Sequence, residues 1–154
     1  MPPPCYASAM RTLETQIEIA APPEQVWRHL MDFASYPSWN PFVLSIKGSA
    51  SLGSKLRVKL SAGGKRSITL RTKVSRYQAS REFAWKGSLP GLFAGEHQFH
   101  LTSIGDDAAP RTRLVHREDF SGLLVPLLWK RVLDRDTRAN FEAMNRALKS
   151  RAEG

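Results

Sequence analysis

The sequence is nearly without cysteine, with the one thiol of Cys5 in 154 residues. A single cysteine excludes an intramolecular disulfide framework and makes a reducing cytoplasm the simplest compartment to expect. Long hydrophobic runs are also missing, since stretches such as Leu123 to Trp129 fall far short of the ~20 residues that span a bilayer. The start, MPPPCYASAM, lacks both the charged region and the long apolar region of a secretory signal. We therefore expect a disordered leader over residues 1–10 and one cytoplasmic domain over 11–154.

Acidic residues are few beside basic ones, 14 against 23, which gives a net charge of +9. Much of the excess alternates with apolar residues along two presumed strands, so we expect it on the outer face of a sheet. Such a face can attract an acidic protein partner through its long-range field, or it can simply be solvated. No aromatic residues are interleaved to stack bases, so nucleic acid is not expected. The residues concerned are Lys55, Arg57, Lys59, Arg71 and Lys73.

The richest segment runs from Ile17 to Phe42. Isoleucines at 17 and 19 alternate with polar residues, as in a half-buried strand. Prolines at 22 and 23 then suit a helix start, where their missing N–H groups would have no partner. Pro37 and Pro41 restrict the end of this segment to short, bent pieces of chain, and Asn40 between them is expected to brace the turn.

Alternating patterns and turn signals predict six further strands, joined mainly by hairpins and therefore antiparallel. The apolar stretch 89–93 is predicted to be a loop that acts as a lid. From 123 to 151 one long helix is predicted, with a single stripe for burial at Leu133, Thr137, Phe141, Met144 and Leu148. The expected strands are 42–46, 55–61, 66–77, 81–87, 96–103 and 112–120.

Several motifs resemble those of the START/Bet v1-like (SRPBCC) superfamily of polyketide cyclase/dehydrase and lipid-transport proteins. The opening IEIAAPPEQVWRHLMDFASYPSWNPF is similar to that superfamily's first strand, helix and turn. Residues 95–101, 116–122 and 123–129 resemble the GEHxFxL, HxExFxG and LLxPLLW motifs of a small bacterial branch. The resemblance spans 12–148. It implies an α+β helix-grip fold, a seven-stranded curved antiparallel sheet around a long C-terminal helix with two short helices after strand 1, which encloses a ligand cavity.

The last two expected strands carry the most specific local pattern. If the turn at 105–110 closes a regular hairpin, Phe99 lies near His116 and His97 near Glu118. The residues on that parity are mostly apolar, which predicts that they face the concave side. Two histidines and a carboxylate would then lie in an apolar surface, where polar groups need partners. The predicted face comprises His97, Phe99, Leu101, Leu114, His116, Glu118 and Phe120.

Three interpretations of this polar group remain open. The side chains can satisfy one another without chemistry, or they can bind a hydroxyl or carbonyl of an apolar ligand. A desolvated His–Glu pair can also act as general acid and base in an aldol-type cyclisation or a dehydration, with His97, His116 and Glu118 as catalytic candidates. Two histidines and a carboxylate are a known metal-ligand set. No HxH or HxxxH spacing supports it here, so neither metal nor cofactor is expected.

The leading hypothesis is a protein that binds or carries a small hydrophobic ligand, lipid, sterol-like or aromatic and polyketide-like, without catalysing a reaction. The alternatives are a cyclase/dehydrase-type enzyme and a protein-interaction module with a basic sheet face. The sequence leaves monomer and homodimer open. The candidate ligand contacts are Trp39, Phe42, Trp85, Phe93, His97, Phe99, His116, Glu118, Phe120, Leu124, Leu128 and Phe141.

Overall fold

The computed structural model describes residues 10–89 and 92–154, apart from the side chains of Leu89, Arg131 and Val132. The predicted leader, except for Met10, and the middle of the predicted lid lie outside the described residues. The strands are β1 (Arg11–Ile19), β2 (Val43–Lys47), β3 (Lys55–Ser61), β4 (Ser67–Gln78), β5 (Glu82–Leu89), β6 (Phe93–Ser103) and β7 (Thr112–Ser121). The helices are α1 (Pro23–Met31), η1 (Phe33–Ser35), α2 (Tyr36–Trp39), α3 (Val125–Leu128), η2 (Trp129–Asp136) and α4 (Thr137–Glu153).

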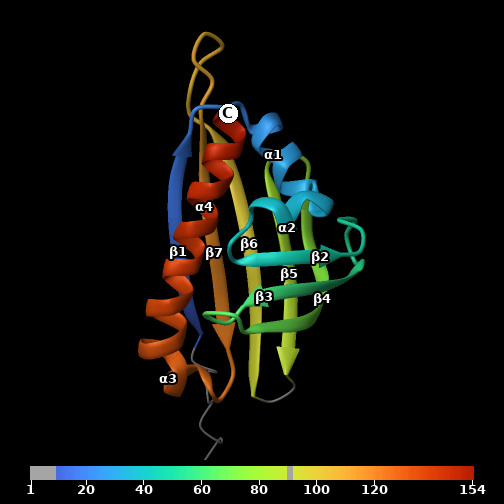
Figure 1. Cartoon of the computed structure of the whole chain (residues 1–154), viewed down its shortest axis with the longest axis vertical. Helices are drawn as coiled ribbons and strands as arrows, with labels where there is room; N and C mark the ends of the chain where they lie inside the picture. The colour runs from blue at the N-terminus through green and yellow to red at the C-terminus, as the bar shows by residue number, and fades with distance from the viewer. Residues whose placement is uncertain (1–9, 90–91) are drawn as a thin grey trace, which may run out of the picture.

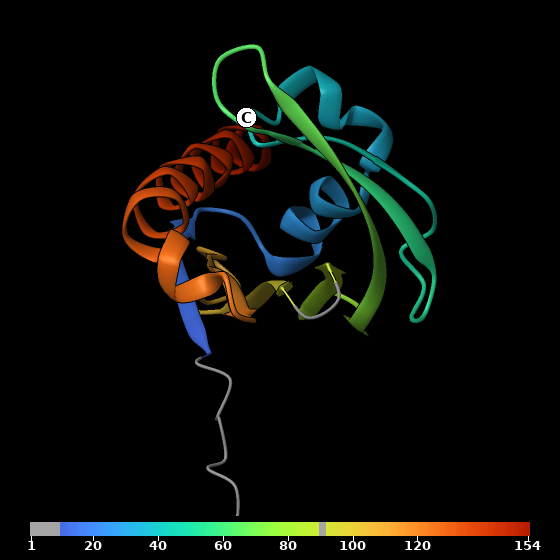
Figure 2. The same ribbon diagram turned by 90° about the horizontal axis from the view of Figure 1, so that it is seen from below.

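All seven strands form one antiparallel sheet in the order β1-β7-β6-β5-β4-β3-β2 (Figure 1). The sheet curls, and α4 lies along its concave side, with its main strand contacts on β1 (Figure 2). The predicted helix-grip fold is confirmed. Its hydrophobic core lies between the concave face and the helices, because alternate side chains of each strand point to that side.

The β6–β7 hairpin has the predicted register. Phe99 pairs with His116, His97 with Glu118, and Leu101 with Leu114. On the other side of β7, β1 adds Thr15 opposite His116. Side chains from three neighbouring strands therefore meet on the concave face.

The loop between β5 and β6 is shorter than predicted, because the ladder between these strands continues to the pair Leu89 and Phe93. Leu92 lies in the turn, and its carbonyl oxygen accepts a hydrogen bond of 3.1 Å from the backbone N–H of Leu124. Gly122 has a φ of 119° and lies so close to Leu92 that a side chain there would collide with the Leu92 backbone. The start of α3 is thus fixed against the end of the β5–β6 hairpin.

The predicted long C-terminal helix is present, and it is made of three parts. The chain forms α3, then the π-helical η2, then α4. Hydrophobic periodicity could not show this, because an apolar stripe marks which residues are buried and not how the backbone bonds are spaced. Leu133, Phe141 and Leu148 of the predicted stripe are buried, whereas Thr137 is half-buried. In the described part of the chain no helix combines the length and the hydropathy needed to cross a membrane.

Candidate functional site

A continuous chain of hydrogen bonds crosses the concave face between the sheet and α4. Glu118 Oε2 lies 3.3 Å from His97 Nδ1, and His97 Nε2 lies 2.7 Å from His116 Nε2. His116 Nδ1 lies 2.8 Å from Asn145 Oδ1. The Asn145 amide donates to Thr15 Oγ1 over 2.9 Å, and the Thr15 hydroxyl donates to the backbone oxygen of His116 over 3.3 Å. Five residues from β7, β6, α4 and β1 thus form one polar path.

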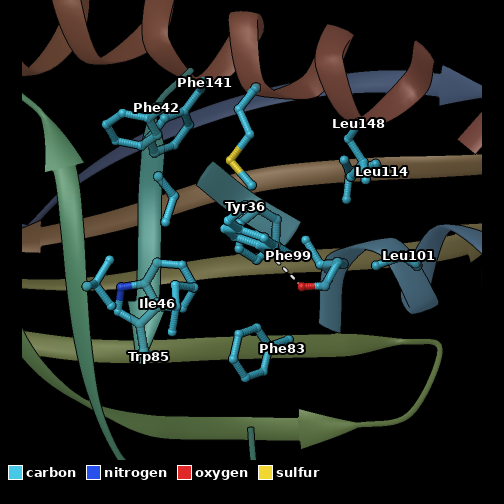
Figure 3. Close-up of a cluster of buried hydrophobic side chains, with 14 of the residues drawn as sticks. Tyr36, Phe42, Ile46, Phe83, Trp85, Phe99, Leu101, Leu114, Phe141 and Leu148 are labelled. Carbon is cyan, nitrogen blue, oxygen red and sulfur yellow. Dashed lines mark hydrogen bonds between the residues drawn. The ribbon is translucent and has the colours of Figure 1, made fainter. Parts of the chain in front are cut away.

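Aromatic rings surround the two imidazoles. Phe141 stacks on His116 with ring centroids 3.9 Å apart, and Trp85 stacks on His97 at 4.5 Å. Phe42 lies beside Phe141 at 5.6 Å, as Figure 3 shows. His97 and His116 are consequently only 2% and 0% exposed.

This enclosure determines which groups carry charge. Burial lowers the pKa of His97 to about 3 and holds the pKa of His116 well below its usual value, so both imidazoles are neutral at pH 7. Burial also raises the pKa of Glu118 to about 8, and the neighbouring Asp119 carboxylate adds to the effect. At neutral pH Glu118 is therefore mainly the uncharged acid.

Among the five residues of the polar path, Glu118 is the most exposed, with 16% of its side chain accessible. Its Oε1 atom lies over Gly95, where an added Cβ would come within 2.6 Å of that oxygen. Glycine at this position therefore leaves the carboxyl group room to lie flat against β6. Glu118 is therefore the residue at which the buried chain of hydrogen bonds comes to accessible surface.

The structure brings half of the twelve predicted site residues into one group of touching rings, and the polar path passes through that group. Phe120 forms a second group with Phe93, at 5.7 Å, and with Trp129, at 6.2 Å. Trp39 lies elsewhere, with its ring 5.1 Å from Tyr36, and Leu124 and Leu128 are half-buried. The first group consists of Phe42, Trp85, His97, Phe99, His116 and Phe141.

Sequence reasoning missed Thr15 and Asn145. Thr15 shares the parity of Ile17 and Ile19 on β1, which could have marked it as an inward polar residue. Asn145 lies four residues after Phe141 and on the same buried stripe of α4, and it is only 2% exposed. A polar residue at an apolar position was the available signal in both cases.

The two imidazole Nε2 atoms bond to each other and do not point at a common centre. In keeping with this, the residues that the structure describes contain no group of three His, Cys, Asp or Glu side chains able to hold a metal ion.

Comparison with known proteins gives one family and many related folds. The model of the family described as "Polyketide cyclase / dehydrase and lipid transport" matches residues 10–153. The Zhui aromatase/cyclase from Streptomyces sp. R1128 is 20% identical, with 94% of each chain covered and a TM-score of 0.67. A START superfamily protein from Mycobacterium smegmatis is 22% identical over 92% of this chain and 97% of that one, with a TM-score of 0.68.

Truncated norcoclaurine synthase from Thalictrum flavum is 11% identical, with 93% of each chain covered and a TM-score of 0.70. At these identities the structural likeness shows the fold and not the activity. No match was found among curated proteins.

Proposed function

Because the chain belongs to the family of polyketide cyclases, dehydrases and lipid-transport proteins, a START/Bet v1-like family of hydrophobic-ligand proteins, we propose that it binds or carries a small hydrophobic ligand on its concave face. The match covers nearly the whole chain, so the proposal applies to this domain itself. The proposed ligand classes are lipids, sterol-like molecules and aromatic or polyketide-like molecules. The single free cysteine is consistent with a cytoplasmic protein.

The observation that carries the proposal is Glu118, a partly accessible side chain bonded to a histidine that aromatic rings enclose. Ligand sites are typically lined by apolar and aromatic side chains, with a few polar groups that set the orientation of the ligand. Trp85, Phe99 and Phe141 form the apolar surroundings of the histidines and are themselves at most 3% exposed. Glu118 provides the polar contact.

Binding of Nile red, a neutral fluorescent probe, tests this proposal. The wild-type protein is expected to bind it, and Phe93→Glu is expected to weaken binding at least tenfold, because Phe93 packs on Phe120 and a carboxylate there would place a charge in the apolar lining. Leu52→Glu is the matched control, since Leu52 is 68% exposed and lies between β2 and β3. The proposal fails if the wild type binds no probe and native mass spectrometry of protein from its own cytoplasm also finds it empty.

A cyclase/dehydrase-type enzyme is the second candidate, and the Glu118–His97 contact favours it. A neutral carboxylic acid can donate a proton to a substrate and take the same proton back in a later step, with His97 as the hydrogen-bond partner that orients it. Glu118→Gln would then abolish turnover while folding is retained. If turnover instead survives in Glu118→Gln while Glu118→Leu loses several kcal/mol of stability, the pair is structural, since leaving a buried polar group without its partner is costly.

A third candidate function rests on the outer face of the sheet. Six basic residues line one surface groove and lie directly opposite one another across adjacent strands, an arrangement that like-charge repulsion disfavours. An acidic protein partner would relieve the repulsion. Its binding should collapse with added salt and survive Phe93→Glu. The two rows are Lys47, Arg57 and Arg71, and Lys55, Lys73 and Lys86.

A further inference from the structure

We infer that the ligand presents a hydroxyl group to Oε1 of Glu118, which accepts the hydrogen bond as part of an uncharged carboxylic acid, and that carboxylate ligands are rejected. This inference rests on the proposed ligand-binding function and names the chemical class of the ligand. It follows from the direction of the protons along the chain from Thr15 to Glu118.

The direction of donation along the hydrogen bonds is set by the His116 carbonyl oxygen, because a carbonyl oxygen can accept but not donate. The backbone oxygen of His116 can only accept, so the Thr15 hydroxyl donates to it. The Thr15 oxygen therefore accepts its other bond from the Asn145 amide, which turns Nδ2 toward Thr15. This orientation leaves Asn145 Oδ1, a pure acceptor, facing His116 Nδ1.

The requirement for one donor and one acceptor in each hydrogen bond then fixes the tautomers of both imidazoles. His116 must carry its proton on Nδ1, so its Nε2 is an acceptor when the ring is neutral. His97 then donates from Nε2, and its own Nδ1 becomes an acceptor. The remaining partner, Glu118 Oε2, has to supply the proton for this last bond. Each hydrogen bond along the chain then joins one donor to one acceptor, and the five residues carry no net charge.

The opposite direction is less favourable. It would require the Asn145 amide to turn over, so that its oxygen faces Thr15. The Thr15 hydroxyl would then donate to Asn145, and the His116 carbonyl oxygen would lose its donor. It would also leave Glu118 ionised beside the Asp119 carboxylate, with Leu13 opposite it on β1 and only His97 on β6 to compensate. No lysine or arginine is among the buried residues of the described chain. The uncharged direction therefore agrees with the burial of the site.

Glu118 Oε1 has no donor among the described residues, and the side chain is 16% accessible. A ligand hydroxyl can donate to it, whereas a methyl ether cannot. A carboxylate ligand would bring a second acceptor and an unpaired charge to a site where the described residues supply no buried cation. The site therefore fits an apolar molecule that carries a phenol or an alcohol, and it disfavours free fatty acids.

Three naphthalenes with matched skeletons test the ligand class: 2-naphthol, 2-methoxynaphthalene and 2-naphthoate. One hydrogen bond should make 2-naphthol bind about fivefold tighter than 2-methoxynaphthalene, with 2-naphthoate weakest. Glu118→Gln should keep this preference, because its amide can donate to His97 while its oxygen still accepts from the ligand. Glu118→Leu should remove it. Tightest binding of 2-naphthoate, or loss of the preference in Glu118→Gln, would overturn the inference.

A ligand-free measurement tests the proton direction separately. The Glu118 pKa is 4.5 in the unfolded chain and is raised to about 8 by folding, so the folded state holds this proton more tightly. The resulting stability is complete below pH 4.5 and is lost as the pH rises through about 8. The urea midpoint should therefore fall between about pH 6.5 and 9 in the wild type and in the control Glu142→Gln, an exposed position on α4, and stay level in Glu118→Gln. A level wild-type curve would refute the uncharged acid.

The outcomes separate the two proposals. Failure of all three naphthalenes to bind would count against the proposed function and this inference together. Equal binding of 2-naphthol and 2-methoxynaphthalene would leave ligand binding in place and overturn the hydroxyl contact alone.

Discussion

Truncation of Phe141 to alanine is expected to lower the free energy of unfolding by about 3–5 kcal/mol, the usual range for a buried phenylalanine. The ring is 0% exposed, and it contacts His116, His97 and Phe42 at once. The cavity left behind would border polar side chains. Urea denaturation followed by tryptophan fluorescence measures the loss.

Two variants frame this result. Phe141→Leu keeps most of the volume and should cost less than about 1.5 kcal/mol beyond the lost stacking. Glu142→Ala changes the neighbouring exposed residue and should be nearly neutral. If Phe141→Ala costs no more than Glu142→Ala, the ring does not support the core as the structure indicates.

Replacement of Asn145 by leucine is expected to cost about 2–6 kcal/mol, because it takes a hydrogen-bond partner from two buried polar groups at roughly 1–3 kcal/mol each. Those groups are the ring N–H of His116, which keeps only its hydrogen bond to the Phe141 backbone, and the acceptor lone pair of Thr15. The two side chains have the same number of heavy atoms and the same branching, so the effect is mainly the loss of hydrogen bonds. Equilibrium urea unfolding measures it, with Arg146→Leu at the adjacent exposed position as the control.

A double-mutant cycle sharpens this prediction. Thr15→Val removes the hydroxyl that accepts from Asn145. If both residues belong to one chain of hydrogen bonds, the double variant should lose less stability than the two single variants together. Strict additivity would show that the two residues stabilise the fold independently.

The register of the β6–β7 hairpin could be predicted because it depends on local information. The turn at 105–110 joins the strands, and side chains alternate strictly between faces, so pairing His97 with Glu118 also placed Phe99 opposite His116. The same alternation put the basic residues of β3 and β4 outside. In a strand, the alternation of residues along the sequence directly determines on which face of the sheet each side chain lies.

The partners of the histidines could not be predicted in this way. Asn145 and Thr15 are 130 residues apart, and they meet only because α4 lies across β1 with a particular rotation about its axis. Neither propensity nor spacing determines that rotation. The π-helical turns of η2 change the rotation per residue between α3 and α4, and therefore the direction in which the buried stripe of α4 faces. The sequence shows no signal for these turns.

The polar path joins the first strand of the domain to its last helix. A chain emerging from the ribosome can pair β6 with β7 early, yet His116 and Thr15 must wait for Asn145, which is made only with α4. Until then the nascent sheet leaves both imidazoles in contact with the surrounding water. Water is therefore excluded from the concave face only once α4 has been made. A polypeptide that stops short of this helix should remain a target for chaperones and proteases.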